Sequence, residues 1–281
     1  MSQSVPHLSE PIQTPKLKSL VKAHWEREPC GTRGVPNADR LEFFRQLERE
    51  RYELEPYIPP FAQFELARDK RVLEIGVGAG TDFVRWVRAG AEATGIDLTD
   101  QAISLVRERL ALEGLSANLY TGDAENLPFE TEGFDIVYSY GVIHHTPNTA
   151  KAVQEIYRVL KTNGLARVMI YHLHSWVALM LWAIHCAGQL RPWKSPRWAV
   201  FHHLESPGTQ AFTVAEARKM FAAFSRVSIS TQLSHGDLLK IRPSSKYQGS
   251  SYARLQALYP RPLVKLLGNR FGLAMLIEAV K

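Results

Sequence analysis

Cysteine is scarce in this sequence, with only Cys30 and Cys186 among 281 residues. Two cysteines exclude a disulfide framework and a cysteine-rich metal site. Long apolar runs are missing as well, because none approaches the roughly 20 residues that a membrane-spanning helix needs. Residues 2–15 are polar and do not read as a signal peptide. We therefore expect a cytoplasmic protein.

Acidic residues are absent from residues 238–277, where the basic side chains are Lys240, Arg242, Lys246, Arg254, Arg261, Lys265 and Arg270. These seven charges exceed the net charge of +6 for the whole chain. Such a segment is compatible with a solvated face, a substrate phosphate site or an anionic membrane surface, which the protein would bind peripherally. It resembles no RNA-binding module, and this disfavours a nucleic-acid partner.

Hydrophobic residues make up 45% of the chain and charged residues 22%, which is typical of a globular protein. From residue 71 onward, apolar segments of strand character alternate with helical ones. The expected strands lie at 71–75, 93–97, 117–122, 134–139 and 166–171, and the helices at 81–88, 100–113 and 149–160. This alternation predicts βαβ units and a parallel sheet covered by helices on both faces.

The segments on either side of this alternation have a different character. Residues 1–69 are expected to form an arm and a helical cap, with helices at 16–26 and after a capping Asn37, before prolines end the second helix. Residues 70–281 would form the main domain, with insertions at about 172–210 and 233–270. Its last elements are predicted as a helix at 213–224 and strands at 226–232 and 272–280.

The apolar residues 175–190 lie inside the first insertion and are too few to span a bilayer. We interpret them as a lid over an apolar substrate. A membrane-surface element and a buried core or dimer helix remain alternatives.

A glycine-rich turn follows the first expected strand, where residues 72–80 read VLEIGVGAG. Its glycines are Gly76, Gly78 and Gly80, which permit a tight turn and close approach of a ligand to the backbone. A dinucleotide fingerprint would need its last glycine at position 81, which is Thr81, so the match to that motif is poor.

Carboxylates end the next two strands. Asp97 ends the second strand, where it can accept hydrogen bonds from both hydroxyls of a ribose, and Asp123 ends the third, where it can accept from an exocyclic amino group. The carboxyl ends of parallel strands are where open α/β sheets bind ligands.

Together these motifs closely resemble the class I S-adenosylmethionine-dependent methyltransferases, in particular the small-molecule branch that includes the ubiquinone and menaquinone C-methyltransferases. The resemblance covers residues 70–171 and rests also on FDIVYSYGVIHHTPN (134–148) and RVLKTNG (158–164). It implies a Rossmann-like α/β fold with seven strands, mostly parallel and the last antiparallel. It also implies S-adenosylmethionine as cofactor, contacted by Glu74, Gly76, Gly78, Gly80, Asp97, Leu98, Asp123, Ala124, Tyr140 and Gly141.

Histidines follow the two central strands, with His144 and His145 after the fourth and His172 and His174 after the fifth. Adjacent strands would bring all four towards the acceptor. We expect His144 or His145 to act as a general base, although roles in shaping the site remain open. Methyl transfer needs no metal, and we expect none. Trp25 and Tyr57, like His172 and His174, are candidates for contacting the substrate.

The sequence thus predicts methyl transfer from S-adenosylmethionine to a small, apolar or amphipathic acceptor. An RNA or protein methyltransferase that uses residues 238–277 is the alternative enzyme. A non-catalytic partner that binds the cofactor and regulates another enzyme is the alternative of another class.

Overall fold

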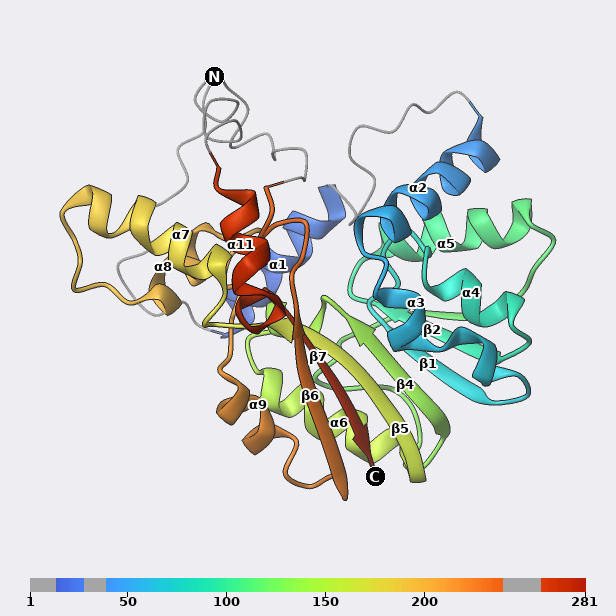
Figure 1. Ribbon diagram of the computed structural model, residues 1–281. Coiled ribbons are helices and arrows are strands. Elements are labelled where there is room, and N and C mark those ends of the chain that lie inside the picture. The colour runs from blue at the N-terminus through green and yellow to red at the C-terminus, as the bar shows by residue number, and fades with distance from the viewer. Residues whose placement is uncertain (1–13, 28–38, 240–258) are drawn as a thin grey trace.

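The computed structural model describes residues 14–27, 39–239 and 259–281 (Figure 1). Seven strands form one sheet in the order β3-β2-β1-β4-β5-β7-β6. The first five strands pair in parallel, whereas β7 runs antiparallel to both β5 and β6. The strands are β1 (Arg71–Ile75), β2 (Glu92–Asp97), β3 (Asn118–Thr121), β4 (Phe134–Tyr140), β5 (Leu160–Tyr171), β6 (Arg226–Gln232) and β7 (Ala274–Val280). The expected fold, with its last strand antiparallel, is confirmed.

Helices cover both faces of the sheet. They are α1 (Thr14–Arg27), α2 (Arg40–Leu54), α3 (Ile58–Ala62), α4 (Phe83–Arg88), α5 (Asp100–Leu112), α6 (Thr149–Val159), α7 (Trp176–His185), α8 (Pro196–His203), α9 (Val214–Met220) and α11 (Arg261–Leu267). Because side chains alternate along a strand, β1, β2, β4, β5 and β7 each contribute side chains to two cores. The core with α3, α4, α5, α7 and α8 lies on one face, and the core with α6 and α9 lies on the other.

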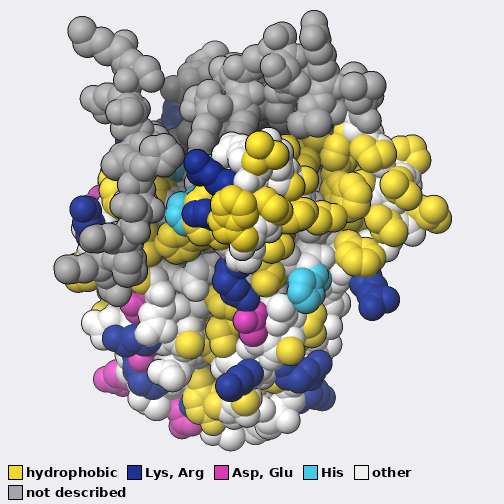
Figure 2. Space-filling model, turned by 90° about the vertical axis from the view of Figure 1, so that its left-hand side faces the viewer, with side chains coloured by type: hydrophobic (Ala, Val, Ile, Leu, Met, Phe, Trp, Pro, Cys, Tyr) yellow, Lys and Arg dark blue, Asp and Glu magenta, His cyan; other side chains and the backbone are white. Residues whose placement is uncertain are grey.

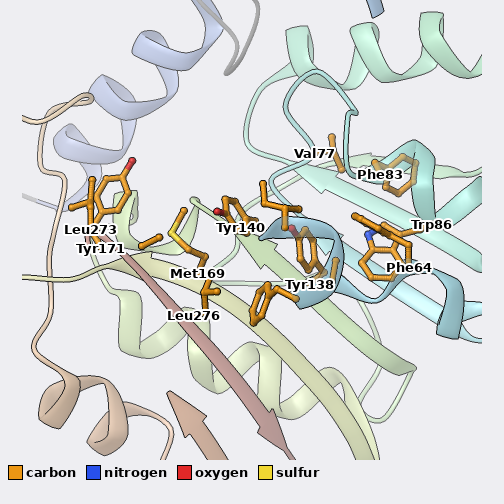
Figure 3. Close-up of a cluster of buried hydrophobic side chains, with 14 of the residues drawn as sticks. Phe64, Val77, Phe83, Trp86, Tyr138, Tyr140, Met169, Tyr171, Leu273 and Leu276 are labelled. Carbon is orange, nitrogen blue, oxygen red and sulfur yellow. The ribbon is translucent and has the colours of Figure 1, made fainter. Parts of the chain in front are cut away.

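The first of these cores leads to the carboxyl ends of the central strands. Figure 3 shows Tyr138 and Tyr140 of β4 and Met169 and Tyr171 of β5 on the same side of the sheet. Farther along the same face, Trp86 lies among other aromatic rings. Helices α1, α7 and α11 gather above the ends of β4 and β5 on the left of Figure 1.

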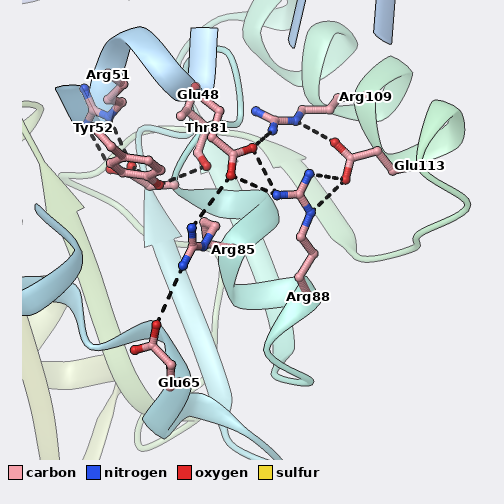
Figure 4. A network of polar contacts seen from close by, with 10 residues as sticks. Glu48, Arg51, Tyr52, Glu65, Thr81, Arg85, Arg88, Arg109 and Glu113 are labelled. Atoms are coloured by element: carbon pink, nitrogen blue, oxygen red, sulfur yellow. Dashed lines mark hydrogen bonds and ion pairs between the residues drawn. The ribbon is translucent and has the colours of Figure 1, made fainter. Parts of the chain in front are cut away.

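Helix α2 is fastened to the first βαβ unit by ion pairs (Figure 4). Glu48 pairs with Arg88 at 2.9 Å and with Arg109, whose side chain is fully buried. Arg109 also pairs with Glu113 at 3.0 Å. Removing one partner of such a buried pair is strongly destabilising, so these contacts hold α2 in register with α4 and α5.

Several local features differ from the sequence-based expectation. Helix α2 begins at Arg40, where the carboxylate of Asp39 accepts from the backbone N–H groups of Leu41 and Glu42, so the expected cap at Asn37 is wrong. Strand β5 begins at Leu160 instead of 166, because Leu160 already pairs with Phe134 of β4. Helix α8 was not expected.

The division into a cap of residues 1–69 and a domain of residues 70–281, with insertions at about 172–210 and 233–270, stays a prediction. The first insertion contains α7 and α8, and the second contains α11. No helix among residues 14–27, 39–239 and 259–281 is long and apolar enough to cross a membrane. Cys30, Lys240, Arg242, Lys246 and Arg254 lie outside the described residues.

Candidate functional site

The glycine-rich turn connects β1 to α4 in a left-handed backbone conformation. Gly76 has φ +81°, and a Cβ atom there would lie 2.2 Å from the side chain of Val142. Gly78 has φ +51°. Residues with a Cβ rarely adopt such conformations, so the turn requires glycine at these positions. Gly80 closes the turn with a backbone hydrogen bond to Val77 at 2.8 Å.

Asp97 at the end of β2 faces this turn. Its carboxylate accepts from the backbone N–H of Gly78 at 3.1 Å and from the N–H and hydroxyl of Thr99 at 3.0 and 2.8 Å. Burial raises the pKa of the Asp97 carboxyl, although these hydrogen bonds oppose the shift. A carboxylate has about four acceptor positions, so one remains for a ligand hydroxyl. Leu98 follows as the link to Thr99, the N-cap of α5.

Glu74 lies in β1, two residues before Gly76. Its carboxylate accepts from the indole N–H of Trp86 at 2.9 Å, and burial raises its pKa well above the usual range. The nearby Asp82 accepts from Arg51 at 2.8 Å and from the hydroxyls of Tyr52 and Tyr138 at 3.0 and 2.9 Å. Burial alone would raise the pKa of Asp82, but Arg51 and the hydroxyl donors hold it below the ordinary value. Glu74 therefore braces the core beneath the turn.

Asp123 lies at the far end of the site, after β3. Lys18 of α1 donates to Asp123 at 2.5 Å and to Glu125 at 2.9 Å. Burial alone would lower the pKa of Lys18, but the carboxylates of Asp123 and Glu125 outweigh it and raise the pKa above its ordinary value. The side chain therefore stays an ammonium. Ala124, between the two acids, is buried. Helix α1 thus covers the position expected to hold adenine.

On the opposite side of the site from Asp123, at the end of β4, one carboxylate accepts hydrogen bonds from two tyrosine hydroxyls. The hydroxyls of Tyr57 and Tyr140 donate to Glu55 Oε1 at 2.8 and 3.1 Å. Burial and the Glu55 carboxylate raise the pKa of both tyrosines, so both stay protonated donors. Gly141 follows with φ +77°, and its N–H donates to Met169 O at 3.2 Å. Tyr57 and Tyr140, one expected on the substrate and the other on the cofactor, therefore share one acceptor.

His145 is the centre of a polar cluster beyond β4. Its Nδ1 lies 2.8 Å from Ser206 Oγ and 3.1 Å from Thr209 Oγ1, and its Nε2 lies 3.4 Å from Glu205 Oε2. The Tyr171 hydroxyl donates to the same Glu205 oxygen at 2.8 Å. Glu205 has φ +46°, a left-handed conformation that costs a residue with a Cβ on the order of 1–3 kcal/mol. Strain of this kind is typical of functional sites.

The other three histidines lie differently. The ring of His144 packs against Tyr171 at 3.9 Å, and burial lowers its pKa well below the usual range. Neither of its nitrogens has a hydrogen-bond partner among the described residues. His172 turns to the backbone oxygen of Gly272, 3.2 Å from its Nδ1, and pairs with His174 at 5.7 Å. No ring contact joins this pair to the first one in the described parts of the chain.

Trp25 links α1 to this cluster. Its ring packs edge-to-face on His145, with the centroids 5.2 Å apart. Lys18 contacts Asp123 and Trp25 contacts His145, so α1 extends from one of these residues to the other. The ring stands beside the candidate base, where a substrate-contacting residue is expected.

Lys18, Glu55, Tyr171, Ser206 and Glu205 are site residues that the sequence did not single out. Lys18 lies 105 positions from Asp123, and Ser206 lies 61 from His145, so no local pattern joins them. The Glu205–Ser206 turn between α8 and α9 carried no motif. Its left-handed residue is not a glycine, which is the usual sequence signal.

Two further observations concern metal binding and the position of the surface pocket. No group of His, Cys, Asp and Glu that could hold a metal ion is present among the residues described. A surface pocket of about 580 Å³ lies at the opposite edge of the sheet, lined by Asp135, Arg167 and Arg226 among others. It contains none of the predicted site residues.

Comparison with known proteins agrees with this geometry. Residues 73–168 match the family described as "Methyltransferase domain". Phthiotriol/phenolphthiotriol dimycocerosates methyltransferase 1 of Mycobacterium ulcerans (strain Agy99) is 40% identical over 97 residues, which are 34% of this chain and 35% of that protein. Sterol 4-C-methyltransferase strm-1 of Caenorhabditis elegans is 30% identical over 113 residues, which are 40% and 33% of the two chains.

The fold has solved counterparts. The PH0226 protein from Pyrococcus horikoshii OT3 superimposes with a TM-score of 0.55 at 16% identity, covering 91% of this chain and 97% of that one. An S-adenosylmethionine dependent methyltransferase from Mesorhizobium loti gives 0.51 at 17% identity, with coverage of 79% and 96%. Residues 73–168 therefore form a methyltransferase domain, and the chain has the fold of solved S-adenosylmethionine-dependent methyltransferases.

S-adenosylmethionine is therefore the cofactor that this methyltransferase domain implies. The positive-φ glycine turn, Asp97 and Asp123 lie along one edge of the sheet, as a nucleoside with an amino-acid tail requires. The chain spans about a third of the length of the curated relatives it matches. Their similarity concerns this domain alone.

Proposed function

We propose that this protein transfers a methyl group from S-adenosylmethionine to an apolar or amphipathic small molecule, at a group that loses a proton to His145. One observation carries the proposal: the His145–Glu205–Tyr171 cluster lies beside the apolar helix α7, which we interpret as a lid. Only residues 172–175 separate Tyr171 from α7. The names of two relatives, a dimycocerosates methyltransferase and a sterol methyltransferase, support an acceptor of this class.

The arrangement of hydrogen-bond donors and acceptors around His145 supports its role as the base. The Thr209 hydroxyl donates to Ser206 O at 2.7 Å, so Thr209 Oγ1 can only accept in this cluster. If Nδ1 of His145 carries the hydrogen, it donates to Ser206 Oγ, and the Ser206 hydroxyl donates in turn to Thr209 at 3.3 Å. Every hydrogen then has an acceptor, and Nε2 keeps its lone pair. A proton taken up at Nε2 would be stabilised by the Glu205 carboxylate.

Besides this base, methyl transfer mainly requires that the protein position the two reactants. The cofactor supplies a methyl group on a sulfonium that is already activated, so in-line positioning carries much of the rate. Asp97, the glycine turn and Asp123 hold one reactant, and the lid orients the other. The proton that leaves the acceptor would move to His145 Nε2 while the acceptor bonds to the methyl carbon and the sulfur–methyl bond breaks, which would leave the cofactor as a neutral thioether.

Product analysis tests the proposal. The protein is incubated with labelled cofactor and, separately, with a lipid extract, a water-soluble metabolite extract, total RNA and total protein. We expect label in a solvent-extractable product from the lipid extract. Label in RNA or protein would favour the alternative enzyme. Cofactor binding without any labelled product would favour a regulatory partner and contradict the proposal.

A further inference from the structure

Helices α7, α8 and α11 form a face that is apolar at its surface. Helices α7 and α11 pack on one another through Trp176, Met180 and Val264. The large apolar side chains exposed on the two helices and beside them are Leu179, Ile184, Leu190, Trp193, Leu263, Leu266, Leu267 and Phe271. Leu190, Trp193 and Leu266 are 83%, 76% and 82% exposed. Figure 2 shows hydrophobic side chains gathered across the upper part of this side, with Lys and Arg beside them.

All the charge in these segments is of one sign. Residues 172–204 and 238–277 contain no Asp or Glu. Arg191, Lys265 and Arg270 are exposed next to the apolar side chains. Exposed leucines and a tryptophan in segments whose only charges are cations are the pattern of a surface that lies in a lipid interface.

We propose that this apolar–basic face, formed by residues 176–203 and 261–271, docks onto an anionic lipid bilayer. The leucines and Trp193 enter the headgroup region, and the three cations contact lipid phosphates. Each lysine or arginine near such a surface contributes about 1 kcal/mol. No helix of the described segments spans the bilayer, so the attachment is peripheral.

A second copy of the chain fits this face less well. A symmetric dimer brings the same patch of both copies together. Cations would then meet cations, and the face has no carboxylate of its own to pair with them. The charge therefore selects an anionic surface.

Docking would bring the site close to the bilayer. Helix α7 starts at Trp176, and Tyr171 of the candidate site ends the strand before it. An apolar acceptor could then pass from the lipid to the site under the lid. The docking itself does not depend on the proposed methyl transfer, and its test needs no turnover.

Vesicle sedimentation tests the docking. The full chain is mixed at about 0.1 M salt with vesicles of phosphatidylcholine alone or with an equal amount of phosphatidylglycerol. We expect sedimentation with the second kind only, and release towards 1 M salt, where the screening length falls to about 3 Å. The triple variant R191Q/K265Q/R270Q should bind on the order of a hundredfold more weakly. The variant L190S/W193S/L266S should also lose binding.

Matched variants elsewhere on the surface are the controls. K70Q/R107Q/K151Q removes the same charge from exposed positions outside the face, and L66S/L112S does the same for exposed leucines. Both should bind like the wild type, and all variants should keep cofactor affinity. No sedimentation of the wild type, or equal loss in the controls, would overturn the proposal. So would a dimer in light scattering that L190S/W193S/L266S converts to monomer.

Discussion

Lys18 of α1 places its ammonium 2.5 Å from a carboxylate oxygen of Asp123, the residue expected to hold the amino group of adenine. Both side chains are largely covered, at 28% and 29% exposed. The same helix reaches Asp100 through Lys22 at 3.6 Å and Gln101 N through Glu26 at 3.2 Å. Ion pairs and a hydrogen bond therefore hold α1 against the end of the site expected to bind the nucleoside.

Replacing Lys18 with Met should tighten cofactor binding about two- to fivefold, because partly exposed ion pairs contribute about 0.2–1 kcal/mol and this one competes for Asp123. Isothermal titration with S-adenosylmethionine measures the change. Lys16→Met, at an exposed position on the same helix, is the control and should change nothing. Weaker binding by Lys18→Met would show that the lysine helps to build the pocket.

Asp97→Ala should weaken cofactor binding by about 1.5–3 kcal/mol, or roughly 10- to 150-fold, because it removes a charge-assisted acceptor. Circular dichroism should show an unchanged fold. Burial raises the pKa of Asp97, and the ionised form is the acceptor. Wild-type affinity should therefore start to fall at a higher pH than the ordinary aspartate value of about 3.9. Asp97→Asn should bind weakly without that pH dependence; an identical pH dependence in this variant would contradict the assignment.

His145→Gln should slow turnover by about 10²–10⁴ and leave cofactor affinity unchanged, because it removes the proposed base. The acidic limb of the pH–rate profile, which arises from protonation of that base, should disappear with it. His144→Gln is the matched control. The His144 ring is buried, its pKa is lowered by burial, and its nitrogens have no partner in the described residues. We expect less than about a tenfold change in kcat there, and a larger loss for His144 than for His145 would refute the assignment.

Glu74→Gln should alter how stability depends on pH. Burial raises the pKa of Glu74 in the folded state above the unfolded value of about 4.3. At this residue the folded protein then binds more protons than the unfolded one between these two pKa values, so the contribution of Glu74 to the free energy of unfolding falls as pH rises through that window. The fall amounts to at most about 1.4 kcal/mol for each pH unit crossed. In urea unfolding, the free energy of the wild type minus that of Glu74→Gln, whose amide can still accept from Trp86, should therefore decrease with rising pH; a difference that does not change with pH would contradict the assignment.

The sequence predicted what short-range patterns determine. Alternating apolar residues and glycine turns gave the strands and the main helices, and the βαβ order placed Asp97 and Asp123 at one edge of the sheet. It missed α8, which has no apolar repeat and whose signals are local: Ser195 caps it and Pro196 occupies its first turn. Two short signals within a run rich in tryptophan and histidine did not stand out.

The polar partners of the site could not be predicted for another reason. The contacts Lys18–Asp123 and Ser206–His145 join residues 105 and 61 positions apart. Both contacts depend on how the N-terminal helices and the insertions pack on the complete sheet. The residue types involved do not by themselves predict these pairings. The four histidines were expected to converge because adjacent strands end together. Instead, His172 turns towards the backbone of Gly272, and the two pairs keep separate contacts.

The position of β7 between β5 and β6 dictates when the sheet can be completed during synthesis. Residues 71–171 can pair as five parallel strands as they leave the ribosome, because each strand finds its neighbour in segments already made. Strand β6 has no partner in the sheet until residues 274–280 emerge and insert between it and β5. Until then the edge of β5 is open, and Trp176 and Met180 of α7 lack Tyr259 and Val264, which pack against them in the complete chain. An open strand edge beside uncovered apolar side chains favours aggregation, so this interval is when the nascent chain is exposed to it.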